Sequence, residues 1–214
     1  MKRAIGIICM ILGAALISCA LWLFAGNEQE EELAQSMAEE YLPQIMELIQ
    51  EKTDESHSSQ INTSYISEVV PEDIHDPNGD YVGNMLVTEI DGYGFIGYIS
   101  IPKLGLELPV VSETDMDVMK LAPCRFSGSP KTNDLVVGAH NYERHFGNID
   151  KLSKGDTVLF TDMEGITWEY RVEFTELLLE SDTEELAKGE FPLTIYTCTY
   201  DGNSRVTVRC KSVQ

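Results

Sequence analysis

The sequence has few basic residues for its acidic content. Its 214 residues include 15 Lys and Arg against 36 Asp and Glu, a formal net charge of −21 at pH 7. Nucleic acids and anionic membrane surfaces repel a protein of that charge, which argues against both as partners. Hydrophobic residues still make up 43% of the chain, which is enough to fill a packed core and argues against a disordered protein.

Paired cysteine motifs are also missing. The chain has five cysteines, an odd number, and none of them forms the C-x-x-C pattern of a zinc or redox site. At least one thiol must therefore be free. We expect Cys124 and Cys210 to be structural residues, although a disulfide between them is permitted outside the cell.

No charged residue occurs from Ala4 to Ala25, a run of 22 residues near the amino terminus. As a helix this run spans roughly 33 Å, enough to cross the hydrocarbon core of a bilayer. Lys2 and Arg3 precede it and acidic residues follow it, so the positive-inside rule places the amino terminus in the cytoplasm. We predict a cytoplasmic tip and a transmembrane anchor over residues 1–26. Two alternatives stay open, lipoprotein processing at Cys19 and a cleaved signal peptide, although no A-x-A-like cleavage site is present.

Residues 27–92 are predicted to form an acidic, partly helical linker. Residues 26–60 hold ten acidic residues and one basic residue. Apolar residues recur every fourth position at Leu33, Met37, Tyr41, Ile45 and Ile49, which is typical of an amphipathic helix. Pro43 should kink or split that helix. We favour a solvated stalk; the alternative is a helix packed on the outer face of the following domain.

Residues 93–214 are predicted to form a mainly β domain. Apolar runs bounded by turn residues indicate strands over 94–100, 106–111, 135–139, 157–161, 166–175, 193–199 and 205–211. Short helical patches are expected over 116–121, 146–152 and 184–188, and residues 162–165 should form a hairpin turn. Seven or eight short strands in one domain suggest a closed or nearly closed β-barrel.

Three residues at strand ends could carry chemistry. Cys198 ends the run 193–199, and Arg205 opens the next strand after a short polar loop, so a hairpin brings the two together. His140 ends another apolar run, at the edge where a cleft can form. A thiol, an imidazole and a guanidinium supply a nucleophile, an acid and base, and an oxyanion stabiliser.

Each of these residues also has an ordinary structural interpretation. A free cysteine is often a small buried apolar residue, a histidine at a strand end is often structural, and an arginine there is often a surface charge. Arg209 lies four residues after Arg205 on the same strand face and is the alternative oxyanion residue. His145 is the alternative histidine, but it lies in a loop.

The combination resembles the sortase family of cysteine transpeptidases. Residues 193–206 (LTIYTCTYDGNSRV) are similar to the family's T-L-x-T-C motif followed by Arg, with Ile195 in place of Leu. Residues 133–140 (NDLVVGAH), preceded by SGSP at 127–130, are similar to its histidine region, and GYISIP at 97–102 to its opening strand. The likeness covers residues 94–211 in the family's order. It implies an eight-stranded sortase-type β-barrel with short helices, preceded by the transmembrane helix and the acidic linker.

The resemblance also implies a reaction. Cys198 would attack the Thr–Gly bond of an LPxTG-like sorting signal at the carboxyl end of a secreted protein, and His140 would protonate the leaving amine. Arg205 would hold the substrate carbonyl oxygen, and Thr197 and Asn141 are expected to contact substrate. An amine of peptidoglycan or of another protein would resolve the thioester on the outer side of a Gram-positive type cell membrane. No organic cofactor is needed.

The subclass and calcium binding stay open at this stage. Pilus-polymerising sortases tend to have an aromatic residue after an Asp-Pro pair and a second apolar segment at the carboxyl end. In this sequence Asp76-Pro77 is followed by Asn78, and no second apolar segment precedes Gln214, so the chain is not obviously a pilus polymerase. Acids in the 176–185 segment could bind calcium, as in some sortases, although a solvated charge run is the favoured interpretation. Two other functions are weighed: a different cell-wall cysteine peptidase or L,D-transpeptidase, whose usual Ser-His-Gly-Cys run is absent, and a non-catalytic binding barrel.

Overall fold

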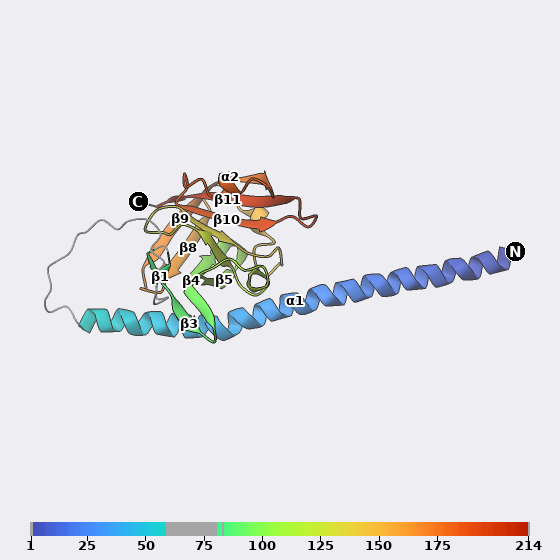
Figure 1. The fold of residues 1–214 in the computed structure, drawn as a ribbon, viewed down its shortest axis with the longest axis horizontal. Helices are drawn as coiled ribbons and strands as arrows, with labels where there is room; N and C mark the ends of the chain where they lie inside the picture. The colour runs from blue at the N-terminus through green and yellow to red at the C-terminus, as the bar shows by residue number, and fades with distance from the viewer. Residues whose placement is uncertain (1, 59–80, 83, 214) are drawn as a thin grey trace.

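The computed structural model describes residues 2–58, 81–82 and 84–213, and within these the side chains of 10–20, 31–54 and 84–213. A long helix, α1 (Lys2–Ser58), precedes a β-rich unit (Figure 1). The Asp76-Pro77-Asn78 segment, which bears on the sortase subclass, lies outside the described residues.

Eight strands of the β-rich unit close into a barrel. They are β4 (Tyr93–Ile101), β5 (Leu106–Val111), β6 (Cys124–Ser127), β7 (Leu135–Gly138), β8 (Thr157–Asp162), β9 (Thr167–Leu179), β10 (Leu193–Cys198) and β11 (Ser204–Ser212). Their order is β4-β5-β6-β7-β10-β11-β9-β8, and pairing between β8 and β4 closes the ring. The β5–β6 and β7–β10 pairs are parallel and the others are antiparallel. The expected eight-stranded barrel is therefore confirmed.

The remaining elements are short. They are β1 (Tyr81–Val82), β2 (Met85–Leu86), β3 (Thr88–Ile90), α2 (Thr183–Leu186) and the 3-10 turns η1 (Pro102–Leu104), η2 (Val118–Lys120) and η3 (Ile149–Lys151). β3 pairs with β4, so the boundary expected at residue 93 falls inside a hairpin. The folded unit therefore includes residues that the sequence assigned to the linker.

Alternating residues of the strands fill the barrel interior. On β7 the side chains of Leu135 and Val137 face the core, and on β10 those of Leu193 and Ile195 do so. Because successive strand residues point to opposite faces, the residues between them lie on the outer face of the barrel. At Gly97, where β4 pairs with both β5 and β8, an added Cβ would lie 2.0 Å from a backbone oxygen, so glycine permits the closure.

Part of α1 packs on the outer face of the barrel, which differs from the solvated stalk favoured by the sequence. Ala34, Met37, Tyr41, Ile45 and Ile49 are buried. All but the first belong to an apolar cluster with residues of β4, β5 and η2. The four-residue spacing puts these side chains on one stripe, and the barrel wall offers an apolar surface to cover it. Helix α1 is continuous through Pro43 rather than split, and its ribbon changes direction along its length (Figure 1).

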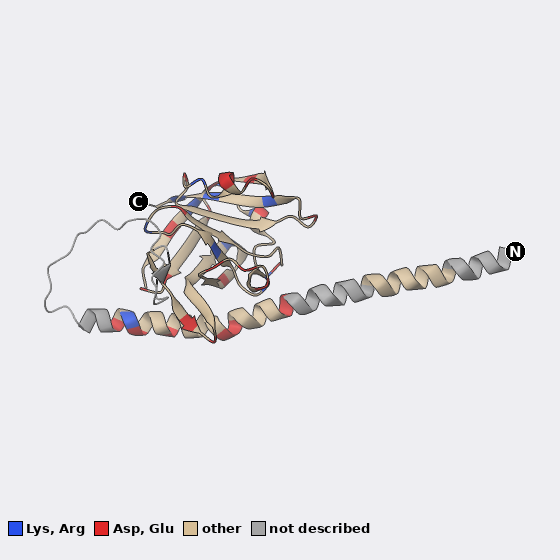
Figure 2. Cartoon of the chain, in the orientation of Figure 1, with Lys and Arg blue, Asp and Glu red and all other residues tan. Residues whose placement is uncertain are grey.

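The predicted anchor, residues 4–25, lies within α1, on the part that extends past the barrel (Figure 1). Figure 2 shows acidic residues on the part of α1 beside the barrel and no charged residue on its described part near the amino terminus. Among the described residues, no helix is both long and apolar enough to span a membrane.

Cys124 and Cys210 are both buried and reduced, as expected for structural residues. Cys210 belongs to the barrel core, whereas Cys124 belongs to the cluster under α1, so the barrel wall separates them. Burial raises the pKa of each thiol to about 12, which keeps both protonated near neutral pH. The alternative of a disulfide between them is not found.

Candidate active site

Cys198 and Arg205 face each other across the β10–β11 hairpin. Cys198 is the last residue of β10 and is paired with Arg205 in the antiparallel register. Directly opposed residues of an antiparallel pair project from the same face of the sheet. Since Ile195 faces the core, both Cys198 and Arg205 lie on the outer face of the barrel.

His140 follows β7, the other neighbour of β10. The parallel register pairs Tyr196 with Gly138, and the Ala139 N–H donates to the Tyr196 carbonyl at 3.1 Å. His140 lies two residues past Gly138 and Cys198 two residues past Tyr196, so both lie at the same end of two paired strands, whose backbones are roughly 4.8 Å apart. The opposed Cys198 and Arg205 and the residue His140 therefore lie at the same end of neighbouring strands.

The aromatic ring of Tyr196 lies under the Arg205 guanidinium. The Cζ of Arg205 lies 5.8 Å from the centre of the Tyr196 ring. A Cβ added at Gly138 would lie 2.4 Å from that ring, so glycine makes the space that Tyr196 occupies. Phe126 of β6 meets the ring edge-on at 5.9 Å. Burial raises the pKa of Tyr196 to about 12, against an opposing effect of the Arg205 charge, so the phenol stays neutral.

Arg205 uses one of its guanidinium nitrogens in hydrogen bonds to backbone carbonyls. Its Nη1 donates to the Glu180 carbonyl at 2.5 Å and more weakly to the Leu179 carbonyl at 3.5 Å. Its Nε is buried and has no hydrogen-bond partner among the described residues. A buried N–H without a partner is costly in a folded protein.

His140 is oriented by its neighbours and borders a cavity. Its backbone N–H donates to the Met119 carbonyl at 3.3 Å, and its ring stacks on Tyr142 with centroids 4.0 Å apart. A cavity of about 380 Å³ lies next to it, lined by Glu31, His140, Asn141, Tyr142, Glu143 and Tyr200. Glu31 belongs to α1 and accepts a hydrogen bond from the Arg144 N–H at 3.2 Å. Helix α1 thus contributes to the cavity beside His140. The sequence did not predict this contact, because a helical repeat shows which face of a helix is apolar but not which surface it packs on.

The alternative histidine, His145, is 1% exposed. Its pKa is lowered to about 4, mainly by burial and further by the nearby His140. It is therefore neutral at neutral pH and closed to substrate, so its position favours His140 as the acid and base.

The alternative arginine, Arg209, is paired with Thr194, four residues from Cys198 along β10. It is 2% exposed, and all three of its guanidinium nitrogens donate to protein oxygens. Because these donors are already used, the geometry favours Arg205 for an oxyanion role.

The two expected substrate contacts differ in position. Asn141 lines the cavity beside His140. Thr197 is buried, and its hydroxyl donates to the Ala139 carbonyl at 2.9 Å. Its side chain points away from the outer face, because it alternates with Cys198. Thr197 therefore ties β10 to the residue before His140, and the expected side-chain contact with substrate is not supported by this position.

Two acidic residues of the 176–185 segment accept hydrogen bonds from other groups of the protein. Glu176 accepts a hydrogen bond from Arg209 at 2.7 Å, and Asp182 accepts one from the Leu179 N–H at 3.2 Å. Within the part of the chain that the structure describes, no three His, Cys, Asp or Glu residues are grouped so that they could hold a metal ion.

The matches of this chain to known proteins all point to one family. The family model described as Sortase domain matches residues 99–213, just over half of the chain. The structure of sortase A from Corynebacterium diphtheriae is similar, with 26% identity and a TM-score of 0.51; the match covers 57% of this chain and 62% of that protein. No curated protein sequence matches the chain.

Two more distant structures share the fold over most of their length. The Sortase D5 transpeptidase of Clostridium perfringens has 21% identity and a TM-score of 0.55, covering 86% of this chain and 99% of that one. Sortase C1 of Streptococcus agalactiae has 22% identity and a TM-score of 0.55, covering 89% and 98%. The three similar structures bear different class letters, so the subclass stays open.

Proposed function

The chain belongs to the sortase family, and on this premise we propose that it is a cysteine transpeptidase that cleaves an LPxTG-like sorting signal. The proposed product is a new peptide bond between the cleaved protein and an amine of peptidoglycan or of another protein. The observation that supports the proposal is the direct opposition of a thiol and a guanidinium at the end of the β10–β11 pair, with an imidazole two residues past the same end of the neighbouring strand β7.

The first half of the reaction forms a thioester. The Cys198 thiolate attacks the carbonyl carbon of the scissile Thr–Gly bond and gives a tetrahedral intermediate. The carbon–nitrogen bond then breaks, and the imidazolium of His140 gives its proton to the leaving amine. Stacking on Tyr142 holds the imidazole in place during this transfer.

The second half reverses the proton movement. The acceptor amine attacks the thioester carbonyl, and His140 takes the proton that the amine loses. The carbon–sulfur bond breaks and restores the Cys198 thiolate, so the protons balance over one cycle. The cavity beside His140, lined in part by the carboxylates of Glu31 and Glu143, is open to an arriving amine.

Arg205 stabilises the oxygen that becomes negative in both intermediates. Its position directly opposite Cys198 in the β10–β11 register supports this role for the guanidinium. A guanidinium remains charged at any working pH, so the donor is available throughout the cycle.

The experiment uses the full-length chain in detergent, a fluorescent LPxTG-like peptide and an added amine. We expect amide product with the wild-type chain, and a thioester adduct on Cys198 that intact-protein mass analysis detects when the amine is withheld. Cys198→Ala should abolish both signals. An electrophilic peptide should label Cys198 and spare Cys124 and Cys210, because burial keeps those thiols protonated.

Three results would contradict the proposal in different ways. Cleavage retained in Cys198→Ala would remove Cys198 as the nucleophile. Hydrolysis without any transfer to the amine would indicate a cysteine peptidase. An unmodified Cys198 and an intact peptide under all conditions would indicate a binding barrel.

We also propose that the amino-terminal part of α1 is a single-pass membrane anchor, with the barrel on the extracytoplasmic side. The support is the uncharged run 4–25 with two basic residues before it and acidic residues after it. The proposed substrates, secreted proteins with a carboxyl-terminal sorting signal, would meet the enzyme on that side.

A further inference from the structure

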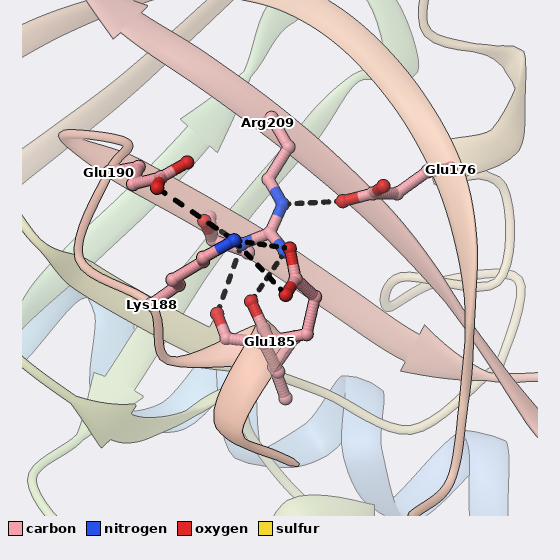
Figure 3. A network of polar contacts seen from close by, with 7 residues as sticks. Glu176, Glu185, Lys188, Glu190 and Arg209 are labelled. Atoms are coloured by element: carbon pink, nitrogen blue, oxygen red, sulfur yellow. Dashed lines mark hydrogen bonds and ion pairs between the residues drawn. The ribbon is translucent and has the colours of Figure 1, made fainter. Parts of the chain in front are cut away.

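Arg209 of β11 is among the largest fully buried side chains of the described residues. Its Nε donates to the Glu176 carboxylate at 2.7 Å, and its Nη2 donates to the Glu185 carbonyl at 2.8 Å (Figure 3). Its Nη1 donates to the Leu186 carbonyl at 3.0 Å and the Thr194 hydroxyl at 3.1 Å. A buried charge with this many partners is strongly fixed, and removing it would leave several polar groups unpaired.

These contacts fasten the segment that joins β9 to β10, residues 180–192, which we call the β9–β10 connector. The Glu185 and Leu186 carbonyls belong to the end of α2, the four-residue helix of this connector. So short a helix has little stability of its own. Phe191, near the end of the connector, also lies 5.1 Å from the Arg209 guanidinium. Arg209 therefore fixes the connector against the outer face of the barrel.

The last residue of β9 and the first residue of the same connector hold Arg205. The carbonyls of Leu179 and Glu180 accept hydrogen bonds from the Arg205 Nη1. The side chain of Leu186 belongs to an apolar cluster with Tyr196, the ring beneath the Arg205 guanidinium. Arg205 and Arg209 lie four residues apart on one strand face, so both arginines bind one connector.

We propose that Arg209 is a positioning residue: it fixes the β9–β10 connector so that the Leu179 and Glu180 carbonyls hold the Arg205 guanidinium opposite Cys198. The inference rests on the proposed function, in which Arg205 stabilises the oxyanion. Arg209 touches no reacting atom, and its effect on the reaction passes through Arg205.

The shape of the guanidinium suits this task. Its three nitrogens reach acceptors on β9, on β10 and on the connector at the same time. The single ammonium group of lysine lacks that planar fork of donors. Arg209→Lys should therefore keep the charge and lose the fixed geometry of the connector.

The experiment is a double-mutant cycle on the full-length chain in detergent, with kcat and KM measured for the sorting peptide. We expect Arg209→Lys to lower kcat up to about 100-fold with a small change in KM, because a displacement of about 1 Å at a catalytic group can have that effect. In an Arg205→Lys background, the same substitution should lower kcat less than about threefold, because residues that act through one another are not additive.

Two further variants keep the experiment decisive. Lys188→Ala is the matched control, because Lys188 contacts Glu185 in the same network (Figure 3) but is half exposed and does not touch Arg209; it should leave kcat unchanged. Glu176→Gln weakens the contact to the Arg209 Nε and leaves the carbonyl contacts, so it replaces Arg209→Lys if that variant does not fold. Circular dichroism at the assay temperature verifies that each variant is folded.

The outcomes separate this inference from the proposed function. Equal fold-losses from Arg209→Lys in the wild-type and Arg205→Lys backgrounds would overturn the positioning role and leave the proposed function intact. Full activity of the folded Arg209→Lys and Glu176→Gln variants would do the same. An unchanged kcat in Arg205→Lys would instead overturn the proposed role of Arg205 and the inference with it.

Discussion

His140 and His145 both lie against Tyr142, with ring centroids 4.0 and 5.9 Å from it, but their surroundings differ. His140 borders a cavity, whereas His145 is fully buried. The strand-end position of His140 follows from the sequence pattern. The burial of His145 does not, because it depends on the loop after β7 folding back onto the barrel.

The lowered pKa of His145 predicts a pH-dependent stability. Burial, and then the charge of His140, lower this pKa to about 4, below its unfolded value, so the unfolded chain binds a proton that the folded chain does not. Stability is therefore present above the unfolded pKa and is lost as the pH falls toward 4. The loss from this residue is about 2 kcal/mol between pH 7 and pH 5.

Urea unfolding followed by near-ultraviolet circular dichroism measures this loss. Wild-type protein should lose more stability between the two pH values than His145→Gln, which carries no titrating group at this position. A variant with the same pH dependence as wild-type protein would show that other groups account for it.

At the scale of elements, the sequence pattern and the structure agree best where turn residues bound an apolar run on both sides. The strand expected over 106–111 matches β5, and those expected over 193–199 and 205–211 match β10 and β11 within a residue. β6 was missed because it has four residues, begins directly after Pro123 and alternates weakly. β9 runs four residues past its expected end, on exposed Leu177 and Leu179, because it pairs there with β11.

Helix α1 gives a prediction at the same scale. Ile45 is fully buried between α1 and the barrel, so Ile45→Ala should lower the free energy of unfolding by about 2–5 kcal/mol. Glu47 lies two residues away on the exposed side, and Glu47→Ala should change it by less than about 0.5 kcal/mol. Chemical unfolding of both variants measures the difference. Equal values would mean that α1 leaves the barrel in solution.

At the scale of the whole molecule, the uncharged amino-terminal run is suited to a membrane, whereas the acidic remainder of the chain is suited to water. We predict that the full-length chain stays with membranes after an alkaline carbonate wash. Replacing Leu16 and Ile17 by lysine should release it, because each lysine at the centre of a span costs about 3 kcal/mol. Leu33→Lys, on an exposed position of α1 outside the run, is the matched control and should be retained.

Two outcomes would change this view. Retention of the double lysine variant would show that the run 4–25 is not the anchor. Release by Cys19→Ala alone would instead indicate attachment through a lipid on that cysteine.

The sequence by itself determined the candidate catalytic residues and most of the strands next to them. Alternation and turn residues are local properties, so they place Cys198, His140 and Arg205 at strand ends whatever the pairing of those strands. The tertiary structure decided which residues meet. The parallel register of β7 with β10 aligns the strand ends at which His140 and Cys198 lie, and the hydrogen bonds of the β9–β10 connector distinguish the surroundings of Arg205 from those of Arg209. The packing of α1 on the barrel also depends on two surfaces far apart in the chain, because an apolar stripe indicates that a helix is buried without indicating what covers it.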